Sequence, residues 1–303
     1  MGLRHFLSLN DLSASELKLI MDRAMALKAD QKDHGACGIM QGKVAVLVFE
    51  KNSTRTRISF ECGIAQLGGH AVFMGPAESH LSRGESVEDT ARVISRMAEL
   101  IIMRTGAHER IEEMASSALV PVINGLTDFN HPCQLLADLQ TYIEYRGDIT
   151  GITAAWIGDG NNVCHSWMNA ARILDFRLNI ATPHGFRPDQ ALHDQCRSNV
   201  FMTDDPFEAA RNAEVVITDT WASMGKENER SERNDAFKPF CVDSRLMQCA
   251  RKDALFMHCL PAYRGQEVTA EVIDGPQSVV FPEAENRLHA QKALIEFLLD
   301  VNA

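Results

Sequence analysis

Short apolar runs alternate with segments of helical spacing along the chain, and this alternation is the feature that most restricts its fold. The run Val44–Phe49 consists of apolar residues only, which is typical of a parallel strand buried on both faces. Residues 56–67 follow with helical spacing and stop at two glycines, and a second strand is predicted from His70. A strand, a helix and another strand within about 30 residues form a parallel crossover unit.

The same alternation continues along the chain and restarts once, near residues 145–151. Strands are predicted at residues 44–49, 70–75, 100–104, 121–124, 152–157, 178–182, 215–219 and 255–258. Helices are predicted at residues 13–30, 56–67, 86–96, 107–117, 132–145, 162–174, 206–211, 244–249 and 283–301. Two successive sets predict two open parallel-sheet α/β domains: residues 1–146 with a C-terminal helix at 284–303, and residues 147–283. In such folds the active site is expected in the cleft between the domains.

Composition and charge exclude several classes of partner. The apolar runs are far shorter than the roughly 20 residues of a membrane-spanning helix, so no membrane partner is expected. The formal net charge of the 303-residue chain is −11. Proteins that neutralise nucleic acid backbones are normally basic, so no nucleic acid partner is expected either.

The cysteines indicate the compartment. Eight are scattered along the chain without a C-x-x-C pair or other spacing suited to zinc. The N-terminus shows no apolar stretch of the kind found in secretory signals. We therefore expect free thiols in a reducing cytoplasm, and no metal site or cofactor.

Cations and hydroxyls follow the strands of the first half. The segment K-N-S-T-R-T-R at residues 51–57 opens a helix directly after a strand. Backbone N–H groups, hydroxyls and the positive end of the helix dipole converge there, which is typical of an anion site. Taken alone, the segment would be better interpreted as a helix cap with solvated arginines. Arg104 ends another predicted strand, and His131 and Gln134 stand at the start of a further helix.

The second half presents a different set of side chains. The segment G-D-G-N-N at residues 158–162 lacks the third glycine of a dinucleotide-binding loop. Asp219 ends a predicted strand, where a carboxylate suits a cationic amine; a turn-capping role is the alternative. Cys259 directly follows another predicted strand, as either an inert buried thiol or a polar contact at a reacting centre. One half thus suits an anion and the other an amine.

These motifs resemble those of the aspartate/ornithine carbamoyltransferase family, in the usual order and over essentially the whole chain. The matching segments are S-T-R-T-R at 53–57, H-P-C-Q at 131–134, H-C-L-P at 258–261 and E-N-R at 285–287. The segment D-T-W-A-S-M-G at 219–225 resembles the ornithine-binding loop of this family. The resemblance implies a carbamoyl phosphate domain followed by a Rossmann-like ornithine domain.

The resemblance also implies the ligand contacts. Carbamoyl phosphate would be held by Ser53, Thr54, Arg55, Thr56, Arg104, His131, Gln134, Cys259, Leu260 and Arg287. Ornithine would be held by Asn162, Asp219, Ser223 and Met224.

Family members form homotrimers, in which a neighbouring subunit completes each active site, so we expect a homotrimer or an assembly of trimers. The residue that the neighbour supplies is typically Gln, in the loop equivalent to residues 76–84. The aligned residue here is His80, whose charge would vary near neutral pH.

The reaction implied is attack of a neutral amine on the carbonyl carbon of carbamoyl phosphate, with phosphate leaving. Orientation and charge stabilisation suffice for it, without a metal or a covalent intermediate. Arg55, Arg104 and His131 are expected to polarise the carbonyl oxygen, while Asp219 and Cys259 orient the amine. Which group takes the amine proton stays open.

Three other functions compete with this hypothesis. A carbamoyltransferase for putrescine or N-acetylornithine would lack the S-M-G at residues 223–225. A nucleotide-binding dehydrogenase would need an intact glycine pattern at residues 158–162. A catalytically silent homologue with a binding or regulatory role would not need the full set of motifs.

Overall fold

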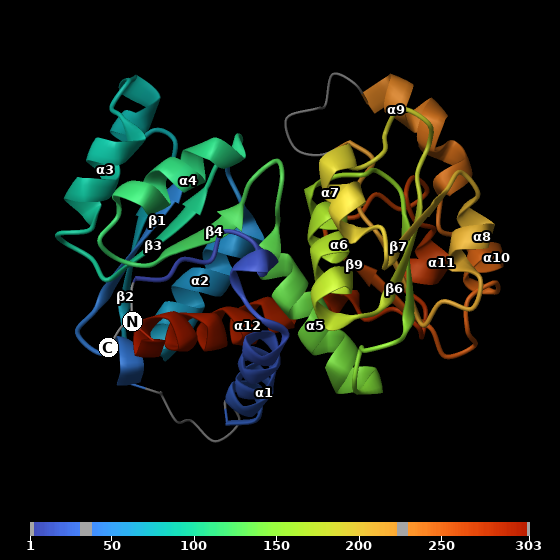
Figure 1. The fold of residues 1–303 in the computed structure, drawn as a ribbon, viewed down its shortest axis with the longest axis horizontal. Helices are drawn as coiled ribbons and strands as arrows, with labels where there is room; N and C mark the ends of the chain where they lie inside the picture. The colour runs from blue at the N-terminus through green and yellow to red at the C-terminus, as the bar shows by residue number, and fades with distance from the viewer. Residues whose placement is uncertain (1–2, 31–37, 223–229, 302–303) are drawn as a thin grey trace. The chain divides into compact units, whose positions relative to one another are not determined.

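The computed structural model describes residues 3–30, 38–222 and 230–301 (Figure 1). The chain divides into two compact units, Met1–Gln140 with Glu285–Ala303, and Thr141–Ala284. Each unit is built on its own parallel sheet, so the prediction of two parallel-sheet α/β domains is confirmed. The divisions fall inside two helices, α5 (Pro132–Arg146) and α12 (Val280–Val301).

The first unit has a four-stranded sheet in the order β2-β1-β3-β4. The strands are β1 (Val44–Phe49), β2 (His70–Met74), β3 (Leu100–Arg104) and β4 (Val122–Leu126). The helices are α1 (Ala14–Asp30), α2 (Thr54–Gln66), α3 (Val87–Ile94) and α4 (His108–Ser117), together with parts of α5 and α12.

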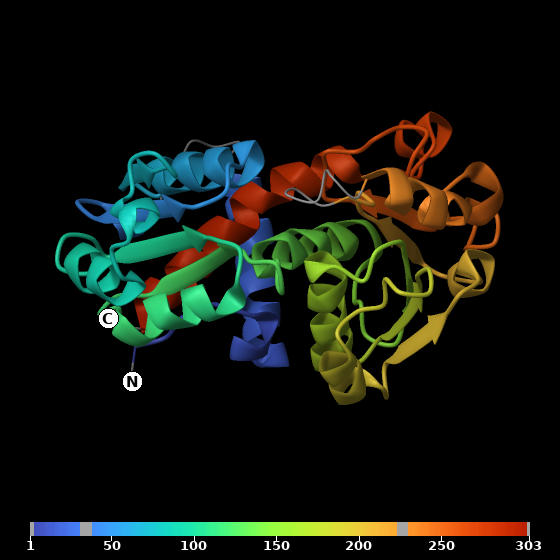
Figure 2. The same cartoon turned by 90° about the horizontal axis from the view of Figure 1, so that it is seen from above.

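The first sheet forms because its central strands are apolar on both faces. Every residue of β3 is buried, as are five of the six in β1. One face packs against α3 and α4 through a cluster that includes Val46, Ile101 and Met114. Figure 2 shows α2 on the opposite face.

The second unit has a five-stranded sheet in the order β7-β6-β5-β8-β9. The strands are β5 (Thr153–Ile157), β6 (Arg177–Ala181), β7 (Val200–Thr203), β8 (Val215–Thr218) and β9 (Leu255–His258). The helices are α6 (Asn162–Leu174), α7 (Gln190–Cys196), α8 (Pro206–Ala210), α9 (Arg230–Phe237), α10 (Ser244–Met247) and α11 (Ala270–Ile273). A core of small and aromatic side chains, including Ala155, Phe237 and Phe256, lies against one side of this sheet.

Both sheets reverse their strand order at one place. The chain leaves β1 toward β2 and returns on the other side of β1 to form β3; in the second sheet the reversal lies between β5 and β8. Ligands of open parallel sheets bind beyond the carboxyl ends of the strands at such points. The segments that the sequence singled out after β1, β3, β5 and β8 therefore stand where the topology favours binding.

Four elements of the described part of the second unit were not predicted: β7, α7, α9 and α11. The strand β7 has only four residues, and as an edge strand it is partly exposed, so its apolar signal is weak. Within residues 3–30, 38–222 and 230–301, no helix combines the length and apolar character that crossing a bilayer requires.

Candidate functional site

The segment after β1 has the geometry of a candidate anion site at the start of a helix. Ser53 is the N-cap of α2 in extended conformation, and its hydroxyl accepts the amide N–H of Thr56 at 3.3 Å. The amides of the first helical turn are not used by the helix itself and point toward its N-terminal end. Together with the helix dipole, they favour a negatively charged ligand beside Ser53 and Thr54.

Two guanidinium groups from distant elements meet at the hydroxyl of Thr56. Arg104, at the end of β3, donates to Thr56 Oγ1 at 3.3 Å, and Arg287 of α12 donates to the same oxygen at 3.3 Å. Arg287 also donates to Gln134 Oε1 at 2.7 Å, while the amide nitrogen of Gln134 donates to Asp138 at 2.8 Å. Thr56, Arg104, Gln134 and Arg287 are all at least 95% buried, so the positive charges lie in poorly hydrated surroundings.

His131 lies in the same cluster. Burial lowers the pKa of its imidazole well below the usual value, and the positive charges of Arg287, Arg104 and Arg55 lower it further. The ring is therefore neutral at physiological pH. A neutral imidazole keeps one N–H that can donate to an oxygen atom of a ligand.

A carboxylate braces the ends of β1 and β3. Glu50, the residue after β1, accepts two hydrogen bonds from Arg110, at 3.0 and 2.6 Å, and a very short one from the hydroxyl of Thr105. Its backbone N–H donates to the carbonyl of Arg104 at 2.8 Å. These contacts fix the backbone at the end of β1, where the segment of residues 51–57 begins, relative to Arg104 at the end of β3.

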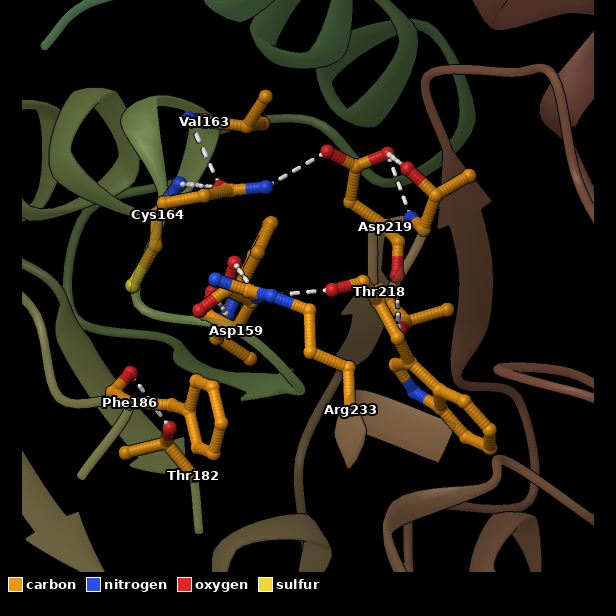
Figure 3. A network of polar contacts seen from close by, with 12 residues as sticks. Asp159, Val163, Cys164, Thr182, Phe186, Thr218, Asp219 and Arg233 are labelled. Carbon is orange, nitrogen blue, oxygen red and sulfur yellow. Dashed lines mark hydrogen bonds and ion pairs between the residues drawn. The ribbon is translucent and has the colours of Figure 1, made fainter. Parts of the chain in front are cut away.

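In the second unit, Asp219 is the centre of a polar cluster beyond β5 and β8 (Figure 3). Its Oδ2 accepts the side-chain amide of Asn161 at 2.7 Å, and its Oδ1 accepts the backbone N–H of Thr220 at 2.7 Å. The thiol of Cys259 donates to the same Oδ1 at 3.1 Å. Asn161 in turn caps α6, since its Oδ1 accepts the amides of Val163 and Cys164. The carboxylate is thus held in one orientation.

The turn after β9 is fixed by a buried histidine. Nδ1 of His258 accepts the backbone N–H of Leu260 at 2.9 Å, so Nε2 carries the proton and faces Glu267 Oε1 at 3.2 Å. Leu260 has a φ of 53°, in the left-handed region that a leucine adopts only when its surroundings impose it. This turn presents Cys259 to Asp219.

Asp219, His258 and Cys259 also carry potential metal-ligand atoms within 4.8 Å of one another. Both ring nitrogens of His258 are engaged in hydrogen bonds, however, and the thiol of Cys259 donates to the carboxylate. A cation could bind His258 only by breaking one of these bonds. The geometry is that of an internally satisfied polar cluster.

The structure brings the predicted residues into two groups. Thr56, Arg104, Gln134 and Arg287 are joined by hydrogen bonds, with Ser53 capping the helix and with Arg55 and His131 close by. Asp219 and Cys259 are joined likewise, and Asn162 is half-buried at the first position of α6. His80 is exposed in a short 3-10 helix, His80–Arg83. Ser223 and Met224 lie outside the described residues.

The sequence did not single out Asn161 as the partner of Asp219. The pair spans 58 positions, and only the neighbouring positions of β5 and β8 bring them together. An Asn before a helix is a common cap, and this role alone would account for it. Topology, rather than a motif, reveals its second contact.

Comparisons with known proteins match both units. The domain described as "Aspartate/ornithine carbamoyltransferase, carbamoyl-P binding domain" matches residues 4–144, and the "Asp/Orn binding domain" of the same family matches residues 150–298. The ornithine carbamoyltransferase of Halorhodospira halophila is 55% identical over 297 residues, which cover 98% of this chain and 99% of that protein.

Two crystal structures show the same fold. That of ornithine carbamoyltransferase from Burkholderia thailandensis has a TM-score of 0.91 at 50% identity, and it covers 98% of this chain and 99% of that one. That of the anabolic ornithine carbamoyltransferase from Campylobacter jejuni has a TM-score of 0.93 at 41% identity, and it covers 99% of this chain and 100% of that one.

Proposed function

The chain belongs to the aspartate/ornithine carbamoyltransferase family and has ornithine carbamoyltransferase activity, and from that premise we propose how its residues divide the reaction. Carbamoyl phosphate and ornithine react to give citrulline and phosphate. The first unit takes the dianionic carbamoyl phosphate, and the second takes the amino acid. The cluster of guanidinium groups around Thr56 and His131 carries this assignment.

At the first unit, the phosphate binds at the start of α2. The amides of residues 53–56 and the side chain of Arg55 hold it and stabilise the charge that it gains on leaving. Arg104, His131 and the hydroxyl of Thr56 polarise the carbonyl oxygen. Because His131 is neutral, it acts as a hydrogen-bond donor, not as a cation. Gln134 holds Arg287 in place.

At the second unit, Asn162, Ser223 and Met224 bind the α-amino and α-carboxylate groups of ornithine, and Asp219 and Cys259 orient its side-chain amine. The free amine has a pKa close to that of lysine, about 10.4, and it must be neutral to attack. Desolvation and neighbouring guanidinium groups both favour the neutral form. The family resemblance also assigns Cys259 and Leu260 to carbamoyl phosphate.

Substitution of Arg55 by glycine tests the phosphate site. Removing one charged donor aimed at developing charge typically lowers turnover by about a hundredfold to a thousandfold, and we expect at least that loss of citrulline formation. Arg92→Gly is the matched control, because Arg92 is an exposed helical arginine whose partner is the exposed Asp89. Near-normal turnover of Arg55→Gly would refute the assignment.

Asp219→Asn tests the ornithine site. We expect KM for ornithine to rise by about tenfold or more, with binding of carbamoyl phosphate close to normal, because the carboxylate belongs to the second group of residues alone. Separate titrations with each ligand distinguish the two effects. An equal loss for both ligands would contradict the division of labour.

We further propose a homotrimer, alone or in larger assemblies of trimers, in which His80 of one subunit reaches the phosphate of its neighbour. Exposure of His80 in a single chain is compatible with this contact. Light scattering measures the oligomer. Mixing His80→Ala with Arg55→Gly tests the sharing of sites: activity regained in mixed trimers supports it, and no regain contradicts it.

Two further proposals concern the biological setting. We propose the biosynthetic direction of arginine metabolism, which the similarity to the anabolic Campylobacter jejuni protein supports. Restored growth without arginine in a bacterium lacking this activity tests it.

We also propose a cytoplasmic location, because the cysteines of the described residues are free thiols, which suit a reducing compartment. Cell fractionation tests this location.

A further inference from the structure

Arg233 of α9 forms a buried ion pair next to the polar cluster centred on Asp219 (Figure 3). Its NH1 donates to Asp159 Oδ2 at 2.8 Å and to the backbone carbonyl of Trp221 at 2.9 Å. The side chains of Arg233 and Asp159 are only 6% and 10% exposed. Removing one partner of such a pair would leave a buried charge uncompensated, so the contact strongly specifies the local structure.

Aromatic rings surround this guanidinium. It lies 4.9 Å from the ring centre of Phe186, which packs in turn on Phe237, four positions after Arg233 in α9. Phe237 also stacks on Trp221, at 6.0 Å between ring centres. Residues four apart share one face of a helix. One face of α9 therefore contacts both the Asp159 loop and the Trp221 segment.

The contacts of Arg233 join the two loops that hold the candidate ornithine residues. Asp159 stands two positions before Asn161 and three before Asn162, in the loop after β5. Trp221 stands two positions after Asp219, in the segment after β8. The Asn161–Asp219 hydrogen bond joins the same two loops at 2.7 Å. Arg233 thus provides a second link across the place where the strand order reverses.

We propose that Arg233 is a positioning residue for ornithine: by linking the Asp159 loop to the Trp221 segment, it holds Asp219 and Asn162 in the geometry that binds the amino acid. This inference rests on the proposed role of Asp219 and Asn162. Arg233 acts through them and does not touch the substrate. The described contacts of Arg233 with Asp159, Trp221 and Phe186 lie beside the ornithine residues, so the proposal predicts a larger effect on ornithine affinity than on carbamoyl phosphate affinity.

The test compares Arg233→Met, Arg233→Lys and a control in steady-state citrulline formation. Methionine retains much of the side-chain volume but removes the charge and both hydrogen bonds. Lysine retains the charge as a single point donor and should restore part of the function. Arg187→Met is the matched control, because Arg187 forms an ion pair with Asp204 in the same unit, but on the surface.

We expect Arg233→Met to raise KM for ornithine by about tenfold or more, while KM for carbamoyl phosphate changes by less than about twofold. Arg233→Lys should lie between Arg233→Met and the wild type, and Arg187→Met should match the wild type. Equal KM values for ornithine in Arg233→Met and the wild type would overturn the proposal. Parallel loss of affinity for both substrates would also overturn it, since that outcome indicates general destabilisation.

A double-mutant cycle with Asp159→Asn gives a readout that does not depend on the stability of Arg233→Met alone. If the two residues act as one link, the double variant should have an ornithine KM close to that of the worse single variant. Additive effects would overturn the link. Asp219→Asn separates the two hypotheses: a normal ornithine KM in that variant refutes the proposed ornithine site, whereas an impaired Asp219→Asn beside a normal Arg233→Met refutes only the role of Arg233.

Discussion

Replacement of Thr56 by valine tests the central geometry of the phosphate site. The hydroxyl oxygen of Thr56 accepts N–H groups from both Arg104 and Arg287. A hydroxyl has two acceptor positions and one donor, so with both acceptor positions filled its own O–H must point away from the two arginines. In the proposed site, this O–H is then available to donate to carbamoyl phosphate. Valine keeps the shape of the side chain but removes this donor.

The expected effect can be estimated from the donor that is lost. A hydrogen bond to a charged group contributes about 1.5–3 kcal/mol. Since about 1.4 kcal/mol corresponds to tenfold, kcat/KM for carbamoyl phosphate should fall by roughly tenfold to a hundredfold. The variant also loses two hydrogen bonds of 3.3 Å, which is longer than typical, so we expect a lower free energy of unfolding by about 1–2 kcal/mol.

The assay is citrulline formation with carbamoyl phosphate varied at saturating ornithine, beside urea unfolding of the same samples. Thr56→Ser is the matched control, because it keeps the hydroxyl and loses only a methyl group. We expect the serine variant to stay within about threefold of the wild type. If valine and serine were equally active, the hydroxyl would not contact the ligand and this reasoning would be wrong.

Three further predictions concern titratable groups. Because burial and neighbouring positive charges lower the pKa of His131, the unfolded chain takes up a proton below pH 6.5 that the folded chain does not; stability is therefore lost by about 1.4 kcal/mol per pH unit until the folded pKa is reached. In urea unfolding, the free energy of unfolding of the wild type minus that of His131→Gln should decrease from pH 7.5 to 5.5. A difference that stays constant over this range would contradict the pKa shift. Burial raises the pKa of Cys133 to about 12, so iodoacetamide at pH 8 should label this thiol in urea but not in the native protein, as mass spectrometry of its peptide can show. Burial of Glu50 opposes ionisation, but hydrogen bonds from Arg110 and a neighbouring hydroxyl lower its pKa overall, so the stability that Glu50 contributes is present at neutral pH and lost in acid. Thermal unfolding should show Glu50→Gln less stable than the wild type at pH 7, and this difference should decrease as the pH is lowered below about 4.3.

The fold could be predicted where sequence and burial agree closely. Val44–Phe49 is apolar throughout, and the strand β1 covers the same residues because its surroundings bury both faces. The strand β7 shows the opposite case. It lies at the edge of its sheet, so partly exposed positions are tolerated and its sequence has a weaker apolar pattern. Sequence signals are thus strong for central strands and weak for edge strands and short helices.

The candidate site was predictable where one segment carries several functional groups. The segment at residues 53–57 combines a cap, hydroxyls and cations directly after a strand, which favours an anion site, although a helix cap with solvated arginines would explain the isolated segment. Arg287 lies 231 positions from Thr56, and its inclusion depended on the family resemblance. Physical reasoning from spacing alone could not have paired these two residues, because only α12 brings them together.

Arg233 marks the limit of such reasoning, and the limit has a physical cause. The stretch at residues 226–235 contains arginines at 230 and 233 among acidic and amide residues, which is also the pattern of a solvated helix. Whether an arginine of such a stretch is buried depends on what faces it: Arg233 meets Asp159, a carbonyl group and an aromatic ring. In the sequence, Asp159 was noted only as part of an incomplete glycine pattern. Its role as the partner of Arg233 is visible only in the structure. Ion pairs of this kind have no local signature, yet they connect the loops at the reversal between β5 and β8. If Arg233 positions ornithine, then part of the amino acid specificity of this enzyme is encoded outside its recognisable motifs.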